Sequence, residues 1–501
     1  MNHRNRSSQL TQFLRLSPAG NKALLCTGLI LLLFSFACGG GSTPRNPPVT
    51  GNFSNASLNG QYAYSLSGTA TPSGGGSFVA YSEAGVFTAD GNGHITSGTD
   101  DFSQSGAFAS NAITGNYSLH NDGTGNINIV FPSGTGSIQF GVSLLNGSQL
   151  YLIETDGFAT GGGSAEKQDT TAFTTPSGTF VFRVHAQDST ANVGAMTINA
   201  GSITGNEDVL ASTGLTSPTL SGSVNAPAAN GRGTLVLSNS NGITSNFAYY
   251  IVNASTMRLL QTDPGVLALG RAEKQSAGPF SAASLTGSFA FGSVGDTALD
   301  GVGGARSAGV FTAGSGTIST GNYDAVQDGN QTTNVGLSGT YTMSSIGRAA
   351  VTLNLQNGIT IQDVFWMVNP SRVFFLVNDT SKQEDGTADL QQSTSFSNAS
   401  LNGQFAFVMD GFDTQSLVDR TGTLQADGNG NLTLNEVLNR QGTISVPGFL
   451  PGTYSAAANG RVSANVGSLS SGLVVYMVSS TSGYVLQNDP GTEISGILGH
   501  Q

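Results

Sequence analysis

Cysteine is almost absent from this chain of 501 residues, and charged side chains are few. Cys26 and Cys38 are its two cysteines, so disulfide bonds cannot provide the framework of the fold and packing must stabilise it. Lys, Arg, Asp and Glu together make up only 10% of the chain, with no basic cluster. Phosphate binding depends on such clusters, and we therefore expect no nucleic-acid partner.

Residues that often carry catalysis or bind metals are also scarce. After the N-terminal segment the histidines are His94, His120, His185 and His500, and none has the spacing of a metal-binding pair. The sequence contains no GxSxG elbow, P-loop or dinucleotide fingerprint. We expect a non-enzymatic protein without catalytic residues, cofactor or bound metal, although paired carboxylates would leave no spacing pattern.

One long apolar run lies near the N-terminus, ALLCTGLILLLFSFA at 23–37. Four basic residues precede it, and its fifteen residues are too few for a comfortable membrane span but suit an export signal. The run ends in SFAC and continues as GGGSTPRNPP, a junction that resembles the lipobox of bacterial lipoproteins. The resemblance implies that residues 1–37 are a cleaved signal peptide, that Cys38 is lipidated and that residues 38–57 begin with this cysteine and form a flexible tether. An ordinary cleaved signal and an uncleaved anchor are the alternatives.

The residue after the lipidated cysteine indicates the membrane to which a lipoprotein is sorted. Gly39 stands where inner-membrane retention signals have Asp, so the resemblance favours the outer membrane or the cell surface. Several acyl chains, as on mature lipoproteins, would hold the protein firmly on the membrane. Without residues 1–37 the chain has 14 basic and 30 acidic residues, a thinly spread negative charge that suits a soluble extracellular surface.

Glycine, with 70 residues, is abundant and marks an internal repeat. The nonapeptide FSNASLNGQ occurs at 53–61 and again at 396–404, and a Gly-x-aromatic-x-aromatic pattern begins at Gly60, Gly178, Gly287 and Gly403. Spacings of more than 100 residues are much longer than those of solenoid repeats. We therefore predict four separate domains, like beads joined by short polar links, at 58–168, 177–275, 285–392 and 400–501.

Each unit has the alternating pattern of β-strands, and turn signals such as DGNG and NDGTG interrupt it at short intervals. In the first unit we predict strands near 60–67, 78–89, 93–100, 111–120, 125–131, 137–145, 148–155 and 160–168. The predicted fold is all-β, with four antiparallel meanders that each close into an eight-stranded up-and-down barrel of calycin-like architecture. Closure removes exposed strand edges. A two-sheet sandwich is the alternative, and a single large outer-membrane barrel is a third.

The chain after residue 37 also resembles, over nearly its whole length, a poorly characterised group of tandem β-repeat lipoproteins predicted in acidobacteria. The marks of the resemblance are CGGG, SLNGQYAYSLSG, FTADGNGHITSG and the closing SAEKQ. The resemblance implies no known activity.

Two DGNG loops allow either a metal-binding or a structural interpretation. Their calcium-ligand candidates are Asp90, Asn92, Asp427 and Asn429. An EF-hand would need flanking helices, which the pattern does not predict, and the acid is missing from the equivalent loops of the second and third units. Asp-Gly and Asn-Gly also favour tight turns. We therefore favour turns over calcium sites.

Aromatic residues recur in the first strand of each unit. Tyr62, Tyr64, Phe405 and Phe407 either fill a core or line a lumen that stacks a ligand, and we favour the core. Trp366, the sole tryptophan, is likewise expected in the core. An acid follows the seventh strand of every unit, and we expect it to cap a turn through its own backbone; these acids are Asp156, Asp263, Asp379 and Asp489.

The function expected from these features is display. A lipid anchor would hold the chain on a membrane, and four similar modules would serve adhesion or weak multivalent binding, with a polysaccharide or a surface protein as partner. A lipocalin-like carrier of a small apolar ligand is the alternative.

Overall fold

The computed structural model of the chain describes residues 51–71, 77–104, 106–132, 136–187, 190–296, 304–413, 416–467 and 472–501. Almost all regular structure in them is β, and it forms four closed antiparallel barrels in tandem. The predicted all-β fold of four barrels is confirmed, and the alternative of a two-sheet sandwich is not the observed fold. The predicted signal peptide and Cys38 lie outside the described residues.

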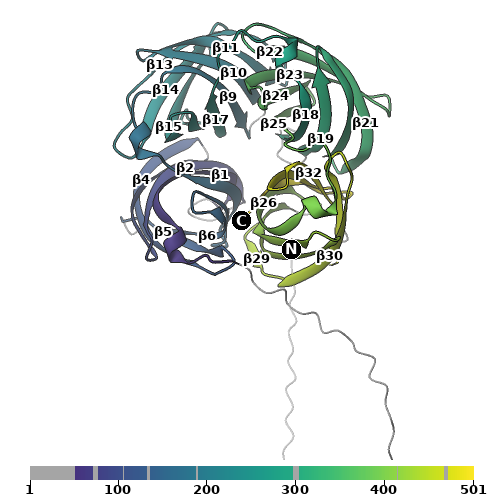
Figure 1. The fold of residues 1–501 in the computed structure, drawn as a ribbon. Helices are drawn as coiled ribbons and strands as arrows, with labels where there is room; N and C mark the ends of the chain where they lie inside the picture. Colours follow the sequence, from purple (N-terminus) through teal and green to yellow (C-terminus); the bar gives the residue numbers. More distant parts are fainter. Residues whose placement is uncertain are drawn as a thin grey trace, which may run out of the picture. The chain divides into compact units, whose positions relative to one another are not determined.

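Each strand of the first barrel overlaps its predicted counterpart. They are β1 (Asn59–Ala70), β2 (Val79–Asp90), β3 (His94–Gln104), β4 (Ala107–Leu119), β5 (Thr124–Val130), β6 (Ser137–Asn146), β7 (Gln149–Glu154) and β8 (Ala159–Lys167). Strands adjacent in sequence pair with one another, and β1 also pairs with β8, which closes the barrel (Figure 1).

The other three barrels repeat this order. The second has β9 (Gly178–Ala186), β10 (Thr190–Asn199), β11 (Ser202–Ala211), β12 (Gly214–Thr216), β13 (Thr219–Val224), β14 (Arg232–Asn239), β15 (Thr244–Asn253), β16 (Thr256–Gln261) and β17 (Ala268–Lys274). The third has β18 (Gly287–Asp296), β19 (Gly304–Gly314), β20 (Thr317–Gln327), β21 (Asn330–Met343), β22 (Arg348–Leu355), β23 (Thr360–Asn369), β24 (Arg372–Asp379) and β25 (Lys382–Leu390). The fourth has β26 (Asn402–Phe412), β27 (Leu417–Asp427), β28 (Asn431–Arg440), β29 (Thr443–Ser445), β30 (Phe449–Ala456), β31 (Arg461–Val466), β32 (Gly472–Ser479), β33 (Ser482–Gln487) and β34 (Glu493–His500). The short strands β12 and β29 are additions to the eight strands that close each of these barrels.

The glycine that opens each repeat is explained by its backbone conformation. Gly60, Gly178, Gly287 and Gly403 have φ angles of +118°, +96°, +118° and +111°. L-residues with a side chain rarely adopt this region, whereas glycine does so at little cost. The aromatic residues that follow enter the barrel interior, where Tyr62 stacks on Phe87 with ring centroids 5.4 Å apart.

The repeated nonapeptide closes one end of a barrel. Its NAS segment forms a short 3-10 helix, η1 (Asn55–Ser57), and the following Leu58 is fully buried in the barrel core. The hydroxyl of Tyr117 donates to the carbonyl of Leu58 at 2.7 Å. In the fourth barrel, η4 (Asn398–Ser400) precedes buried Leu401, whose carbonyl accepts from Tyr454 in the same way.

The outward faces of the first strands are also buried. Between the aromatic residues stand Ala63, Val181, Ala290 and Ala406, and each has no exposed surface. They pack against neighbouring barrels, and all four barrels belong to one compact unit. The prediction of separate beads was wrong because it considered only the core-facing half of each strand's alternation.

Candidate functional site

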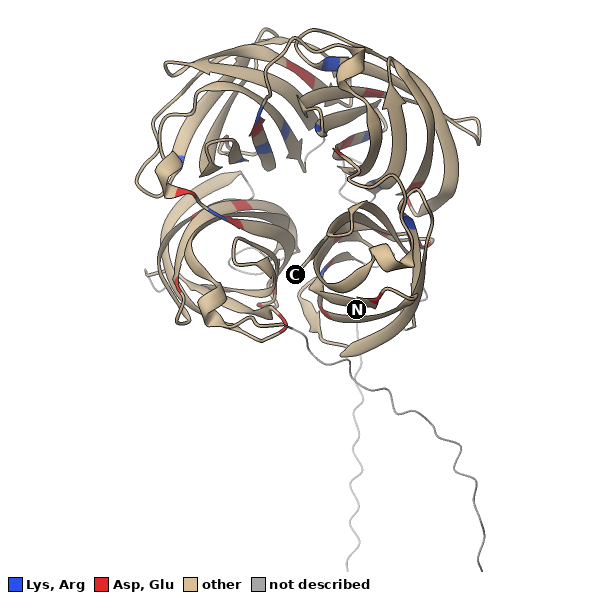
Figure 2. Ribbon diagram, in the orientation of Figure 1, with Lys and Arg blue, Asp and Glu red and all other residues tan. Residues whose placement is uncertain are grey.

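We call the contact surface between two barrels a seam. Apolar side chains join the first barrel to the second, the second to the third, the third to the fourth and the fourth to the first. The contacts therefore form a closed cycle. The strands carry few charged residues (Figure 2). A charge that is buried in a seam is unfavourable unless a specific partner binds it.

Three seams share one polar arrangement. A fully buried aspartate of one barrel binds an arginine and an aromatic side chain of the next barrel. In the seam between the second and third barrels, Arg348 donates to Asp208 at 2.7 and 2.8 Å, and the indole of Trp366 donates to it at 2.7 Å. The equivalent sets in the other two seams are Asp101 with Arg232 and Tyr250, and Asp324 with Arg461 and Tyr476.

The seam between the fourth and first barrels lacks this arrangement. By strand register, Val437 replaces the aspartate, Thr124 the arginine and Ser143 the aromatic residue. Ser143 instead hydrogen-bonds to Thr421 at 2.7 Å. Asn439 donates to the carbonyls of Glu154 and Ala159 at 2.8 and 2.7 Å. Hydrogen bonds between uncharged groups therefore take the place of the aspartate–arginine pair in this seam.

A glutamine at the end of each barrel reaches into the next barrel, and we call these four residues the latch glutamines. Gln168, Gln275, Gln391 and Gln501 each donate from Nε2 to backbone carbonyls of the following barrel, and Gln501 reaches the first barrel. Gln275, for example, donates to Met367 at 2.7 Å and to Ile346 at 3.1 Å. The latch is thus present in all four seams.

A cavity of about 560 Å³ is lined by residues of all four barrels, and we call it the central cavity. A row of ion pairs follows its wall across three barrels. Arg258 and Arg271 donate to Glu166 at 2.9 and 2.6 Å, and Arg372 donates to Glu273 at 3.0 Å. Arg271 also donates to Glu273, which joins the pairs into one network.

The row continues into the fourth barrel and then ends. Arg372 donates to Asp389 at 2.6 Å, and the hydroxyl of Tyr484 donates to the same carboxylate at 2.8 Å. By register, Gly499 takes the place of the acid in the fourth barrel. The wall there includes Ile497 and other uncharged residues, with Asp410 as the one acid that the fourth barrel adds. The central cavity therefore has one side lined by ion pairs and another that is mostly uncharged.

Electrostatics keep the acids of the row ionised. Burial alone would raise the pKa of Glu166, but the guanidinium groups of Arg271 and Arg258 outweigh it and hold this pKa at about 2. For Glu273, burial is likewise outweighed by Arg271 and Arg372, and its pKa is lowered. Glu166 and Glu273 are therefore ionised at neutral pH and match the charges of the arginines that bind them.

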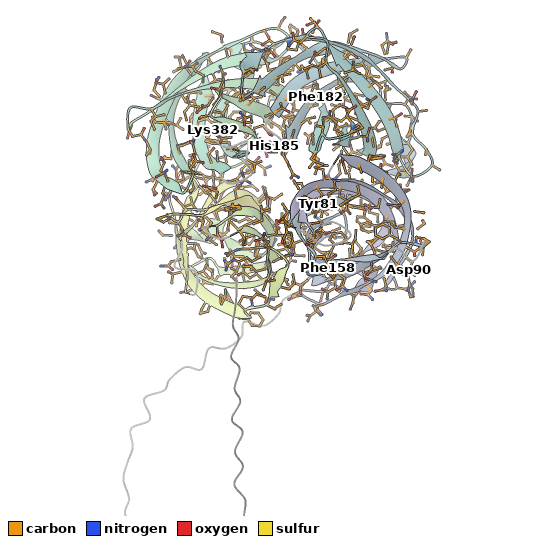
Figure 3. The ribbon with its side chains drawn as sticks, turned by 180° about the vertical axis from the view of Figure 1, so that it is seen from behind. Tyr81, Asp90, Phe158, Phe182, His185 and Lys382 are labelled. Atoms are coloured by element: carbon orange, nitrogen blue, oxygen red, sulfur yellow. The ribbon has the colours of Figure 1, made fainter. Side chains whose placement is uncertain are left out.

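The first barrel contains a contrasting group of acids in its interior. Burial raises the pKa of Asp100 to about 6 and that of Glu154 to about 8, and raises that of Glu83 well above its usual range. Tyr64 donates to Asp100 and Tyr81 donates to Glu154, both at 2.7 Å. Figure 3 labels Tyr81 among the side chains of this barrel. These acids therefore keep their protons to a higher pH than free carboxyl groups do.

The predicted ligand-wall aromatics are core residues. Tyr62, Tyr64, Phe405 and Phe407 are at most 4% exposed and belong to the interior clusters of their barrels. Trp366 is also buried, as predicted, but in a seam rather than inside a barrel.

The DGNG loops are tight turns. Oδ1 of Asp90 accepts from the backbone amides of Asn92 and His94 at 2.7 and 3.0 Å. In the fourth barrel, Oδ1 of Asp427 accepts from Asn429 at 2.7 Å. Asp90 lies at the periphery of the first barrel in Figure 3. Within the described residues, no group of three or more His, Cys, Asp or Glu is arranged to hold a metal ion.

The acid that follows the seventh strand has two roles. Asp156 and Asp379 accept from backbone amides two residues ahead and so cap their own turns, as predicted. Asp263 and Asp489 instead accept from the amides of Asn246 and Gly472 on a neighbouring strand. His185, which has no metal-binding spacing in the sequence, lies with its Nδ1 2.6 Å from Oδ2 of Asp385 in the third barrel.

The seam residues were not predicted from the sequence, although a signal for them exists there. Arg232, Arg348 and Arg461 each follow a glycine and recur at equivalent positions of three units. Each partner aspartate lies one unit earlier, in the first, second and third units, and the aspartate and the arginine are both missing at the seam between the fourth and first barrels. An aspartate and an arginine that are present together at three seams and absent together at the fourth would have indicated that the two side chains are in contact.

Comparison of the chain with protein-family models and with curated proteins found no match. Among the described residues, no helix has the length and apolar character needed to cross a membrane.

Proposed function

We propose that the protein is a non-enzymatic lipoprotein of the cell envelope that presents its four barrels as one binding unit for polysaccharide. The observation that carries the proposal is the closed cycle of seams, with a latch glutamine in each. Residues from different barrels are thereby held in register before a ligand arrives, which lowers the entropic cost of binding. Residues 55–57 of the predicted 38–57 tether belong to η1 on the first barrel, so that part of the tether prediction was wrong. Lipidated Cys38 and the tether residues before the barrel would hold this unit on the outer membrane or cell surface.

The alternative of a small apolar ligand in a barrel lumen receives less support. Cavities inside the third and fourth barrels measure about 20 Å³ each, which is room for about one water molecule. The central cavity is far larger and lies between barrels. Binding by surfaces that the barrels share is therefore the better supported proposal.

The anchor is tested with two cysteine variants of the full chain. Cells that express the wild type, Cys38→Ala or Cys26→Ala are labelled with an alkynyl fatty acid and fractionated. We expect Cys38→Ala to lose the label and to leave the membrane fraction, while Cys26→Ala, the matched control, keeps both. Equal labelling of Cys38→Ala and wild type would contradict the proposed anchor.

The binding partner is tested with envelope fragments. The purified protein is mixed with fragments that have been treated with periodate, which cleaves vicinal diols of sugars, or with protease, and the pelleted fraction is measured. We expect periodate to abolish pelleting and protease to leave it unchanged. Loss of pelleting with protease alone would identify a surface protein as the partner and contradict the polysaccharide proposal, as would no pelleting with untreated fragments.

A further inference from the structure

We infer that the central cavity binds an uncharged, polyhydroxylated ligand, namely a short saccharide or the end of a longer one. The inference rests on the proposed function and deepens it by naming the site and the chemistry of the ligand. A volume of about 560 Å³ lies within the range of small-molecule sites. Because residues of all four barrels line the cavity, the site exists only when the seams are closed.

The balance of charge along the wall argues against an ionic ligand. Arg258 and Arg271 share Glu166, and Arg271 and Arg372 share Glu273. Every one of these guanidinium groups already faces a carboxylate. Capture of a phosphate or carboxylate ligand depends on guanidinium groups that are available to it, and this row offers none without breaking an existing pair.

The same row argues against an apolar ligand. An apolar molecule would exclude water from charged groups that keep part of their surface open, since the side chains of Arg271 and Arg372 are 28% and 36% exposed. That desolvation is unfavourable unless hydrogen bonds replace the water. A sugar hydroxyl both donates and accepts, so one hydroxyl can bridge a guanidinium group and its neighbouring carboxylate. Hydroxyl groups of Ser164 and Thr387 on the wall add further partners.

The mostly uncharged side of the cavity, where Asp410 is the one acid from the fourth barrel, complements this chemistry. Ile497, Gly499 and Leu145 lie there, and the half-buried ring of Tyr484 stands where the row ends. A pyranose ring has hydroxyl groups at its edge and C–H groups on its face. The two unlike sides of the cavity suit these two parts of one ligand, with the aromatic ring available to the C–H face.

Divergence among the four units supports a role beyond folding. Register-equivalent wall positions carry Ser164, Arg271, Thr387 and Ile497, whereas the latch position is glutamine in all four units. A position that serves only the shared architecture can keep one residue type. The divergence produces the asymmetric wall that a small asymmetric ligand requires.

The test uses the purified full chain and a defined set of probes. Saturation-transfer NMR and calorimetry are run with glucose, maltotriose and N-acetylated chitobiose as neutral saccharides, glucuronate and glucose 6-phosphate as charged analogues, and octanol as an apolar probe. The variants are Asp389→Asn, which keeps the side chain's size, and Tyr484→Phe, which keeps the ring. Asp208→Asn is the matched control because it weakens a seam without lining the cavity.

We expect at least one neutral saccharide to bind, and its affinity to fall at least tenfold in Asp389→Asn and about threefold to tenfold in Tyr484→Phe, the loss of one hydrogen bond. In Asp208→Asn, thermal stability should fall while affinity stays within twofold. Binding of charged or apolar probes alone would overturn the ligand class. Saccharide binding unchanged in both cavity variants would overturn the site, while retention of periodate-sensitive pelleting would leave the proposed function standing.

Discussion

Trp366 of the third barrel donates its indole N–H to Asp208 of the second barrel at 2.7 Å, across a seam in which both side chains are fully buried. Arg348 binds the same carboxylate through two further hydrogen bonds. A buried carboxylate with these partners is satisfied, whereas the same carboxylate alone would be costly. These three hydrogen bonds to one carboxylate help to hold the second and third barrels in one register, although their strands carry few charges.

Replacing Asp208 with Asn should weaken the second seam. The substitution keeps the shape of the side chain but removes charge-assisted hydrogen bonds from Arg348 and Trp366, which should lower the free energy of unfolding by about 1.5–3 kcal/mol. Urea denaturation measures the change. The control is Asp379→Asn in a turn, expected to change stability by no more than about 0.5 kcal/mol. Equal effects of the two variants would show that the seam carries no special stability.

The latch glutamines should contribute similar amounts in different seams. Gln275→Ala removes hydrogen bonds to Ile346 and Met367, and Gln501→Ala removes those to Asp122 and Leu144. Each change should cost about 1–3 kcal/mol of unfolding free energy, because two hydrogen bonds across the seam, each worth about 0.5–1.5 kcal/mol, are lost. A costly Gln275→Ala beside a silent Gln501→Ala would mean that the fourth seam does not depend on its latch.

The barrels could be predicted well from the sequence because residues that are close together in the chain determine their strands and turns. Alternation, turn residues and the repeat register define each strand of the first barrel, and Gly60 signals the left-handed backbone at its start. Closure also follows from an even number of strands in a meander. None of these inferences needs knowledge of contacts between distant parts of the chain.

The seams and the central cavity could not be predicted in the same way. Arg348 and Asp208 are 140 residues apart, and each alone is an ordinary charged residue on a strand. The small residue between two core aromatics, such as Ala63, reads as solvent-facing until a second barrel covers it. The cavity depends on four such contacts at once, so no single unit of the repeat contains its pattern.

The DGNG loops should behave as turns rather than calcium sites. The pKa of Asp90 is lowered because the amides of His94 and Asn92 donate to its carboxylate, so its Oδ1 is already engaged. We expect Asp90→Ala to cause a small fall in thermal midpoint, and we expect added Ca²⁺ or EGTA to cause none in the wild type. A rise with Ca²⁺ that is lost in both Asp90→Ala and Asp427→Ala would contradict the turn interpretation and restore the calcium candidates.

The buried acids of the first barrel predict that stability rises as pH falls from about 8 to about 5. Burial raises the folded-state pKa of Asp100 to about 6 and of Glu154 to about 8, above the values of about 4 in an unfolded chain. The folded state therefore binds more protons than the unfolded state in this window. Stability is fully present below the unfolded pKa and is lost as pH rises through the folded pKa.

Glu83→Gln and Glu166→Gln test this prediction as a pair. Glu83 lies with Asp100 and Glu154, and its own pKa is raised by burial, so Glu83→Gln should raise the thermal midpoint at pH 8 and have little effect at pH 5. Glu166 has a pKa of about 2 because of its arginine partners and stays ionised throughout, so Glu166→Gln should lower the midpoint by a similar amount at both pH values. Thermal unfolding of both variants and the wild type between pH 5 and 8 measures these trends. A wild-type midpoint that rises towards pH 8 would contradict the assigned protonation of the first barrel.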